Sequence, residues 1–207
     1  MNWLWILLGI VVVLVGVILV VQGLAKRKAE QAENSRPREP QDPFADVDGA
    51  SQFSPKNIAP GAIIRHGQTD YVVRGSLDIN QGPYVWHEHM VDGGSGSRYF
   101  SVEVDEGTLE LVLWEKGAYS TEPEPPSQTE VNGVIYRESE RGPAHYRSTG
   151  NTGLAESGDM SYVDYQGSGA DSSRRLSYEK FGDSPWEVSL GQVIAPGEVT
   201  VYPAPSQ

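Results

Sequence analysis

The hydrophobic positions of this chain follow two different patterns, the first of them continuous. Residues 3–24 form an almost unbroken apolar run, WLWILLGIVVVLVGVILVVQGL, that contains no charge. A helix of about 22 residues rises about 33 Å, enough to cross a bilayer core of about 30 Å. A cleaved secretory signal is the alternative, but its basic segment would precede a shorter apolar core. We therefore expect residues 1–28 to be a retained transmembrane anchor that contacts the lipid bilayer through residues 3–24.

The residues beside this run predict its orientation. Lys26, Arg27 and Lys28 follow the run directly, whereas no Lys or Arg precedes it. Basic residues next to a membrane helix remain on the cytoplasmic side, and tryptophans such as Trp3 and Trp5 suit a membrane interface. The prediction is a single-pass protein of the cell membrane, with its N-terminus outside and its C-terminal domain in the cytoplasm.

The second pattern is alternating, and it begins after a polar, proline-containing stretch at residues 29–57 that predicts a flexible linker. Short runs rich in Val, Ile, Tyr and Trp then alternate with polar residues between Gly and Pro punctuation, as β-strands do. These runs lie at residues 62–65, 70–77, 84–91, 98–104, 108–114, 131–137, 145–149, 160–165, 174–181, 186–190 and 198–202. We expect an all-β domain at residues 58–203, an antiparallel meander of about ten short strands packed as a sandwich or barrel, and a tail at 204–207.

The β region contains an internal repeat. The segment SRYFSVE at 97–103 matches SRRLSYE at 173–179, and WHE at 86–88 matches YVD at 162–164, both at a spacing of 76 residues. A third block, YVVRG at 71–75, matches YRSTG at 146–150 at nearly the same spacing. The repeat predicts two related halves, 58–118 and 130–203, joined by the acidic, proline-rich break TEPEPPS.

Charge and composition exclude several functions. The chain has 28 acidic and 16 basic residues, a formal net charge of −12, and no cysteine. An acidic surface repels phosphate backbones, so we expect no nucleic-acid partner. Without cysteine there are no disulfides, thiolate nucleophiles or cysteine-ligated metals.

Known catalytic and cofactor signatures are also missing. The sequence has no G-x-S-x-G, phosphate-binding loop, dinucleotide fingerprint or H-E-x-x-H. His87 and His89 share one face of a strand, but two ligands do not complete a metal site, and we expect this face to be exposed to solvent. We predict no catalytic residue, metal or cofactor.

Short aromatic motifs along both halves resemble the bacterial domain-of-unknown-function family 4178. In the first half these are PG at 60–61, Y-x-V-x-G at 71–75, W-x-E at 86–88, FSVE at 100–103 and LW at 113–114. In the second half they are Y-x-D-Y at 162–165, LSYE at 176–179 and W-x-x-x-x-G at 186–191. The resemblance covers about residues 58–203 and implies a β-rich, often membrane-associated bacterial domain, with related genes that lie near membrane-stress and polyamine-metabolism genes. It brings no established catalytic residues, and His89 stands where the family usually has an aromatic residue.

The candidate site consists of acidic and aromatic residues at equivalent positions of the two halves. These are Trp86, Glu88, Glu103, Tyr162, Asp164 and Glu179. Strand alternation puts Glu88 on the same face as the large apolar side chains of Trp86 and Met90, which favours an inward direction. An inward carboxylate must be paired, protonated or neutralised by a cation. The alternatives are a cation pocket, an acid/base pair, or acids that are either paired with Arg74, Arg98, Arg174 or Arg175 or simply solvated.

These features favour a non-catalytic binding or interaction module at the cytoplasmic membrane. Its partner would be a protein or a small ligand, for which a cation such as a polyamine is a candidate. One alternative is an enzyme that uses the carboxylates Glu88 and Glu103. The other is a pure scaffold of a membrane-stress complex, with a filled core in place of a ligand pocket.

Overall fold

The computed structural model describes residues 50–105, 107–120 and 124–204, which all belong to one unit, residues 42–207. The predicted anchor, most of the linker and most of the tail lie outside the described residues. No helix within the described ranges has the length and apolar character needed to span a membrane. The helices there are the short 3-10 segments η1 (Ala50–Phe53), η2 (Gly169–Asp171) and η3 (Pro196–Glu198).

The described residues form an all-β, antiparallel fold, as the sequence predicts. Its eleven strands are β1 (Ile63–His66), β2 (Thr69–Gln81), β3 (Tyr84–Asp92), β4 (Arg98–Asp105), β5 (Thr108–Tyr119), β6 (Gln128–Val131), β7 (Val134–Gly150), β8 (Ser157–Gly167), β9 (Arg174–Phe181), β10 (Glu187–Val193) and β11 (Val199–Tyr202). The predicted strands at 131–137 and 145–149 are wrong as separate elements, because β7 continues through Gly142 and Pro143. Proline is tolerated there since this stretch of β7 pairs with β8 on one edge only.

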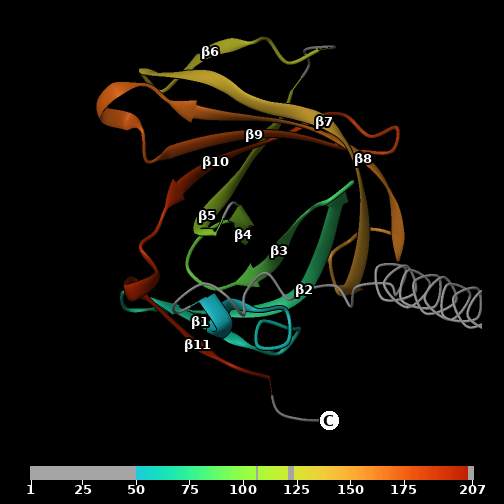
Figure 1. Ribbon diagram of the computed structural model, residues 1–207, viewed down its shortest axis with the longest axis vertical. Helices are drawn as coiled ribbons and strands as arrows, with labels where there is room; N and C mark the ends of the chain where they lie inside the picture. The colour runs from blue at the N-terminus through green and yellow to red at the C-terminus, as the bar shows by residue number, and fades with distance from the viewer. Residues whose placement is uncertain (1–49, 106, 121–123, 205–207) are drawn as a thin grey trace, which may run out of the picture. The chain divides into compact units, whose positions relative to one another are not determined.

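Eight of these strands close into a barrel. The meander β2-β3-β4-β5 and the meander β10-β9-β8-β7 are joined at two seams, the β5–β10 pairing and the β2–β7 pairing. β2 is long enough to pair with β1 along residues 69–72 and with β7 along residues 75–80. Outside the barrel, β1 and β11 extend the sheet beyond β2, and β6 extends it beyond β7 (Figure 1).

The two meanders have equivalent strand registers. Trp86 pairs with Glu103 between β3 and β4, and Tyr162 pairs with Glu179 between β8 and β9. The segments that match at a spacing of 76 residues therefore occupy corresponding places. The third matching block lies at a seam, where Gly75 of β2 is directly opposite Gly150 of β7.

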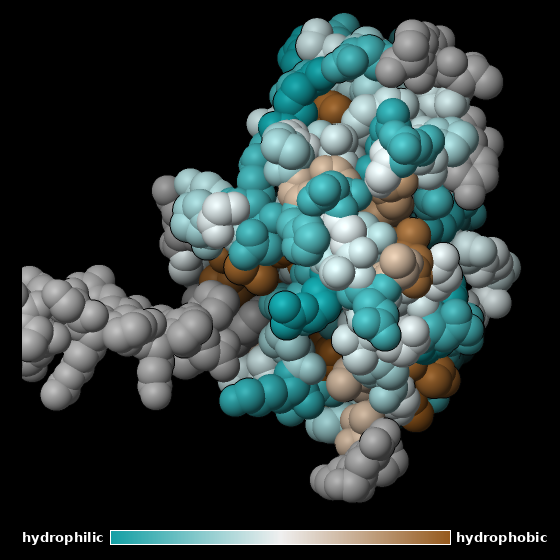
Figure 2. Space-filling model, turned by 90° about the vertical axis from the view of Figure 1, so that its right-hand side faces the viewer, coloured by the Kyte–Doolittle hydropathy of each residue, from teal (hydrophilic) through white to brown (hydrophobic). Residues whose placement is uncertain are grey.

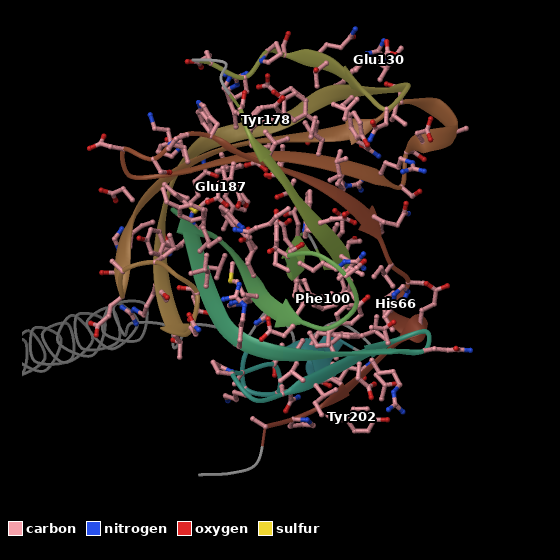
Figure 3. All side chains as sticks on the ribbon, turned by 180° about the vertical axis from the view of Figure 1, so that it is seen from behind. His66, Phe100, Glu130, Tyr178, Glu187 and Tyr202 are labelled. Atoms are coloured by element: carbon pink, nitrogen blue, oxygen red, sulfur yellow. The ribbon has the colours of Figure 1, made fainter. Side chains whose placement is uncertain are left out.

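The apolar side chains form three clusters, one inside the barrel and one on the outer face of each meander. Leu77, Ile79, Tyr99 and Tyr146 belong to the interior cluster. The outer face of the first meander packs against η1, β1 and β11, and that of the second contains residues next to β6. Figure 3 labels one residue of each outer cluster, Phe100 and Tyr178. The face in Figure 2 is mostly hydrophilic, with apolar residues in small separate areas.

Candidate functional site

A cavity of about 380 Å³ lies inside the barrel, and all six candidate residues line it. They are Trp86 and Glu88 of β3, Glu103 of β4, Tyr162 and Asp164 of β8, and Glu179 of β9. Because β3 and β4 correspond in register to β8 and β9, strand alternation directs both sets of side chains to the interior. The structure therefore brings together residues that are widely separated in the chain.

Further acidic residues line the cavity that sequence reasoning missed. Glu110 of β5 pairs in register with Glu103, and Glu140 of β7 pairs with Asp164. Alternation along β5 places Glu110 on the same face as Val112 and Trp114, so that pattern contained a usable signal. The position of Glu140 follows a register shift in β7 that the sequence does not reveal.

Acidic groups dominate the wall of the cavity. Its seven acidic residues are Glu88, Glu103, Asp105, Glu110, Glu140, Asp164 and Glu179. Arg175 is the one basic residue among the lining residues, and its guanidinium makes a two-pronged contact with the Glu110 carboxylate at 2.6 Å and 3.0 Å. Because the guanidinium of Arg175 is paired with Glu110, no basic residue among the lining residues compensates the charge of the other six acidic groups.

Glu88 and Glu179 form a carboxyl pair across the barrel. They extend from β3 and β9, which lie opposite each other in the closed ring, and are 4% and 6% exposed. Burial raises the pKa of Glu88 to about 7, an effect that a hydrogen bond from Glu179 partly offsets. Burial and the nearby Glu88 charge raise the pKa of Glu179 well above its usual range. Near neutral pH, Glu179 thus stays protonated, and its carboxyl O–H donates a hydrogen bond to the Glu88 carboxylate.

Asp164 and Glu103 occupy the corresponding positions on β8 and β4. Burial raises the pKa of Asp164 to about 7, while a hydrogen bond with Ser177 acts in the opposite direction. Burial, with the charges of Glu110 and Glu140, raises the pKa of Glu103 to about 7. The cavity therefore contains four carboxyl groups whose ionisation is suppressed for lack of positive charge.

One oxygen of this cluster has no hydrogen-bond partner in the described part of the chain. It is Oε2 of Glu88, which is fully buried. The ammonium of Lys116 lies close enough to favour the charged form of Glu88, but its short contact, at 2.7 Å, is with Glu187. A buried carboxylate oxygen without a donor is costly, and a donor in the cavity would remove that cost.

The expected ion pairs between arginines and these carboxylates are not the ones that form, so this alternative is wrong. Within the described residues, each of the four arginines pairs with a carboxylate outside the set of Glu88, Glu103, Asp164 and Glu179. The pairs are Arg74–Asp92 at 3.3 Å, Arg98–Glu115 at 3.4 Å, Arg174–Asp171 at 3.5 Å and Arg175–Glu110 at 2.6 Å. Alternation explains the result for Arg98, which faces away from the interior beside Glu115.

Aromatic rings form the apolar part of the wall. Trp86 and Tyr162 meet edge to face with ring centroids 5.2 Å apart. The hydroxyl of Tyr162 lies 2.7 Å from a Glu140 carboxylate oxygen and is also hydrogen bonded to Gln81 of β2. Trp114 donates its indole N–H to the Ser101 hydroxyl at 2.8 Å. Hydrogen bonds thus hold Tyr162 and Trp114 in place, and the aromatic wall offers ring faces or edges to a ligand.

His87 and His89 are buried, so the prediction of a solvent-facing pair is wrong. They pair in register with Val102 and Phe100, and this face belongs to the outer cluster of the first meander. His89 is hydrogen bonded to Ser76 at 2.9 Å, and burial lowers its pKa to about 3. In the ranges that the structure describes, no group of three or more His, Cys, Asp or Glu side chains is arranged to hold a metal ion.

Comparison with known proteins places the chain in a family. It belongs to the family described as Domain of unknown function (DUF4178), whose model matches residues 59–196, and the resemblance predicted from the aromatic motifs is confirmed. Uncharacterized proteins of Mycobacterium bovis and Mycobacterium tuberculosis are 39% identical to it over 208 residues, covering 99% of this chain and 98% of each relative. No solved structure matches the chain.

Proposed function

We propose that this member of the DUF4178 family is a membrane-anchored binding module whose barrel holds a small organic cation without transforming it. The observation that carries the proposal is the cavity itself, which has seven acidic residues in its wall and a single arginine already paired with one of them. The unpartnered Oε2 of Glu88 supplies an acceptor for a ligand N–H group.

Charge, aromatic content and size support an organic cation. Buried carboxylates without counter-charges are costly, and a cation among them would let them ionise. The Trp86 and Tyr162 rings add attraction for an ammonium or guanidinium group. A volume of about 380 Å³ falls within the range of about 300–1,000 Å³ that is usual for small-molecule sites. A polyamine is one candidate among such cations.

Calorimetry on the full-length chain in mild detergent tests the binding. The most direct probe is a matched pair of ligands, butylammonium and its uncharged isostere 1-butanol, followed by 1,4-diaminobutane. We expect heat from at least one charged compound and none from the isostere. Glu88→Gln and Asp164→Asn should weaken the binding about tenfold or more, because each removes a buried charge near the ligand. Glu115→Gln, a carboxylate outside the cavity, is the matched control. No heat from any charged probe would overturn the proposal.

The membrane attachment rests on the sequence of the anchor. The apolar run at 3–24 and the basic residues that follow support a single span with the barrel in the cytoplasm. A C-terminal tag should remain with the membrane fraction and should be protected from protease in intact cells. A tag that is cleaved in intact cells would contradict the orientation, and one that is recovered free of membranes would contradict the anchor.

An enzyme is the second candidate, because Glu88 and Glu103 have pKa values of about 7 and so fall in the range of general acids and bases. In this reading the cation would be a substrate. Incubation of each bound probe with the protein, followed by mass spectrometry, separates the two functions. Recovery of unchanged probe supports the binding module, and a new product supports the enzyme. A cavity with converging carboxylates disfavours the pure scaffold.

A further inference from the structure

We propose that the ligand's positive group binds to the Glu88–Glu179 pair. Its binding displaces the proton that the pair holds in the empty cavity. The inference rests on the proposed function and specifies where the cation binds and how its binding depends on pH. Before binding, Glu179 is protonated and donates a hydrogen bond to the Glu88 carboxylate. After binding, an N–H group of the ligand contacts both carboxylates, and the proton leaves to the solvent.

The geometry of the pair supports this exchange. Glu88 and Glu179 come from opposite strands, line the same cavity and are almost completely buried. Oε2 of Glu88 is the buried acceptor that the proton on Glu179 leaves unsatisfied. A single proton bridges two oxygens, whereas an ammonium group donates up to three hydrogen bonds and can satisfy this acceptor as well.

The groups around the pair determine the charge it tolerates. Asp164 of β8 opposes ionisation of both carboxyls, whereas Lys116 of β5 favours it. Tyr99 of β4 is buried and contributes no charge, because burial raises its pKa well above the usual value. The charge of Lys116 is in turn shared with Glu187 of β10, at 2.7 Å.

These surroundings supply one cation that is already in an ion pair, against several acidic groups. One proton therefore remains on the pair near neutral pH, and an added positive charge replaces it. Without the ligand, full ionisation would leave adjacent like charges in a buried site. With the ligand, the same two charges become its counter-ions.

The test is a count of protons released on binding. Butylammonium is titrated into the full-length chain at pH 7 in phosphate and in HEPES, whose ionisation enthalpies differ. We expect the observed heat to differ between buffers by the equivalent of about 0.5 to 1 proton released per ligand. The dissociation constant should fall by up to about tenfold per pH unit and should still be falling from pH 7 to pH 8, because burial and the Glu88 charge hold the pKa of Glu179 well above its usual range, so the pair keeps its proton at neutral pH.

Two variants assign the proton to the pair. In Glu179→Gln the amide still donates to Glu88 but does not titrate, so proton release should fall at least twofold while binding persists. Glu88→Gln should have the same effect on the proton count, and it serves as a second reading if one variant folds poorly. Glu115→Gln should release as many protons as the unmodified chain.

The outcomes separate this inference from the proposed function. No heat with any cation would overturn the proposed function and the inference with it. Heat that is equal in both buffers would leave the cation site standing and overturn the exchange. Proton release that persists unchanged in both Glu179→Gln and Glu88→Gln would overturn the assignment to this pair.

Discussion

Glu88 and Glu179 line the same cavity from opposite strands of the barrel, although they belong to different meanders. Both side chains are almost completely buried. The pair therefore depends on a proton, or on another positive charge, to remain buried. The stability of the barrel should consequently depend on pH in one way when the cavity is empty and in another when it holds a cation.

The empty protein should lose stability as the pH rises. Glu88, Glu103 and Asp164 have pKa values of about 7 in the folded chain, above their ordinary values of 4.5, 4.5 and 3.8. The folded state thus binds more protons than the unfolded state, so their contribution is complete below the ordinary values and is lost as the pH rises through 7. From pH 6.5 to pH 8.5 we expect a loss of roughly 1 kcal/mol for each group.

Thermal unfolding followed by circular dichroism measures this effect. The midpoint temperature should fall between pH 6.5 and pH 8.5, and Glu88→Gln should reduce the fall where Glu115→Gln does not. Below pH 6.5 the buried His89 acts in the opposite direction, because its pKa is lowered from 6.5 to about 3. A midpoint that rises across the upper range would contradict the assigned protonation of the cavity.

Gly191→Ala should destabilise the barrel. An added Cβ would lie 2.7 Å from Cε3 of Trp114 and 2.7 Å from Cγ1 of Val112, both in the cavity wall. Relief of this overlap requires movement of a packed indole, at a cost of about 1–3 kcal/mol in the free energy of unfolding. Gly197→Ala is the control, since nothing lies within 4 Å of its Cβ position. Equal chemical-denaturation midpoints for the two variants would refute the prediction.

Arg175→Gln should strengthen cation binding. The substitution removes the guanidinium that neutralises Glu110 and so adds one net negative charge to the wall. We expect a gain of about 2- to 10-fold in affinity for butylammonium at low salt, and a smaller gain at high salt. Arg174→Gln is the matched control, because Arg174 pairs with Asp171 and is absent from the wall. Weaker binding by a folded Arg175→Gln protein would contradict a cation-attracting cavity.

Ser76→Ala should expose the cost of burying His89. The Ser76 hydroxyl is hydrogen bonded to Nδ1 of His89, and the imidazole is 1% exposed. Loss of the hydroxyl leaves a buried polar atom without its partner, which costs about 1–3 kcal/mol. Urea unfolding measures the difference, and Ser173→Ala, on an exposed turn, provides the comparison. If both substitutions had the same small effect, this hydrogen bond would not contribute to stability.

Strand positions and the inward carboxylates could be predicted because both follow from alternation along single strands. Trp86 and Glu88 share a face in any extended segment, and the repeat gives the same arrangement for Tyr162 and Asp164. The length of β7 could not be predicted in this way, since the tolerance for Pro143 depends on which of its edges is paired.

Local sequence patterns also could not predict which residues cover the outer faces of the meanders. His87 and His89 alternate correctly with Glu88, but their register partners Val102 and Phe100 belong to an outer cluster that also includes residues of η1, β1 and β11, from both ends of the described chain. Whether a face opposite the cavity meets solvent or a further layer is a property of the tertiary structure. Residues of the wall such as Glu140 were missed for a similar reason, because a register shift determines which partner they face.

Closure of the barrel by β2 and β7 has a consequence for the order in which the chain folds. Gly75 meets Gly150, and in the other seam Val112 meets Val193, so each seam joins residues far apart in the sequence. Contacts of this kind form slowly, because the entropy of a long loop must be lost before strand pairing contributes any stabilisation. During synthesis the first meander emerges with the edges of β2 and β5 unpaired, which are templates for intermolecular strand pairing until the second meander arrives. Release of the nascent chain, rather than completion of the first meander, should therefore mark the moment at which this protein becomes resistant to aggregation.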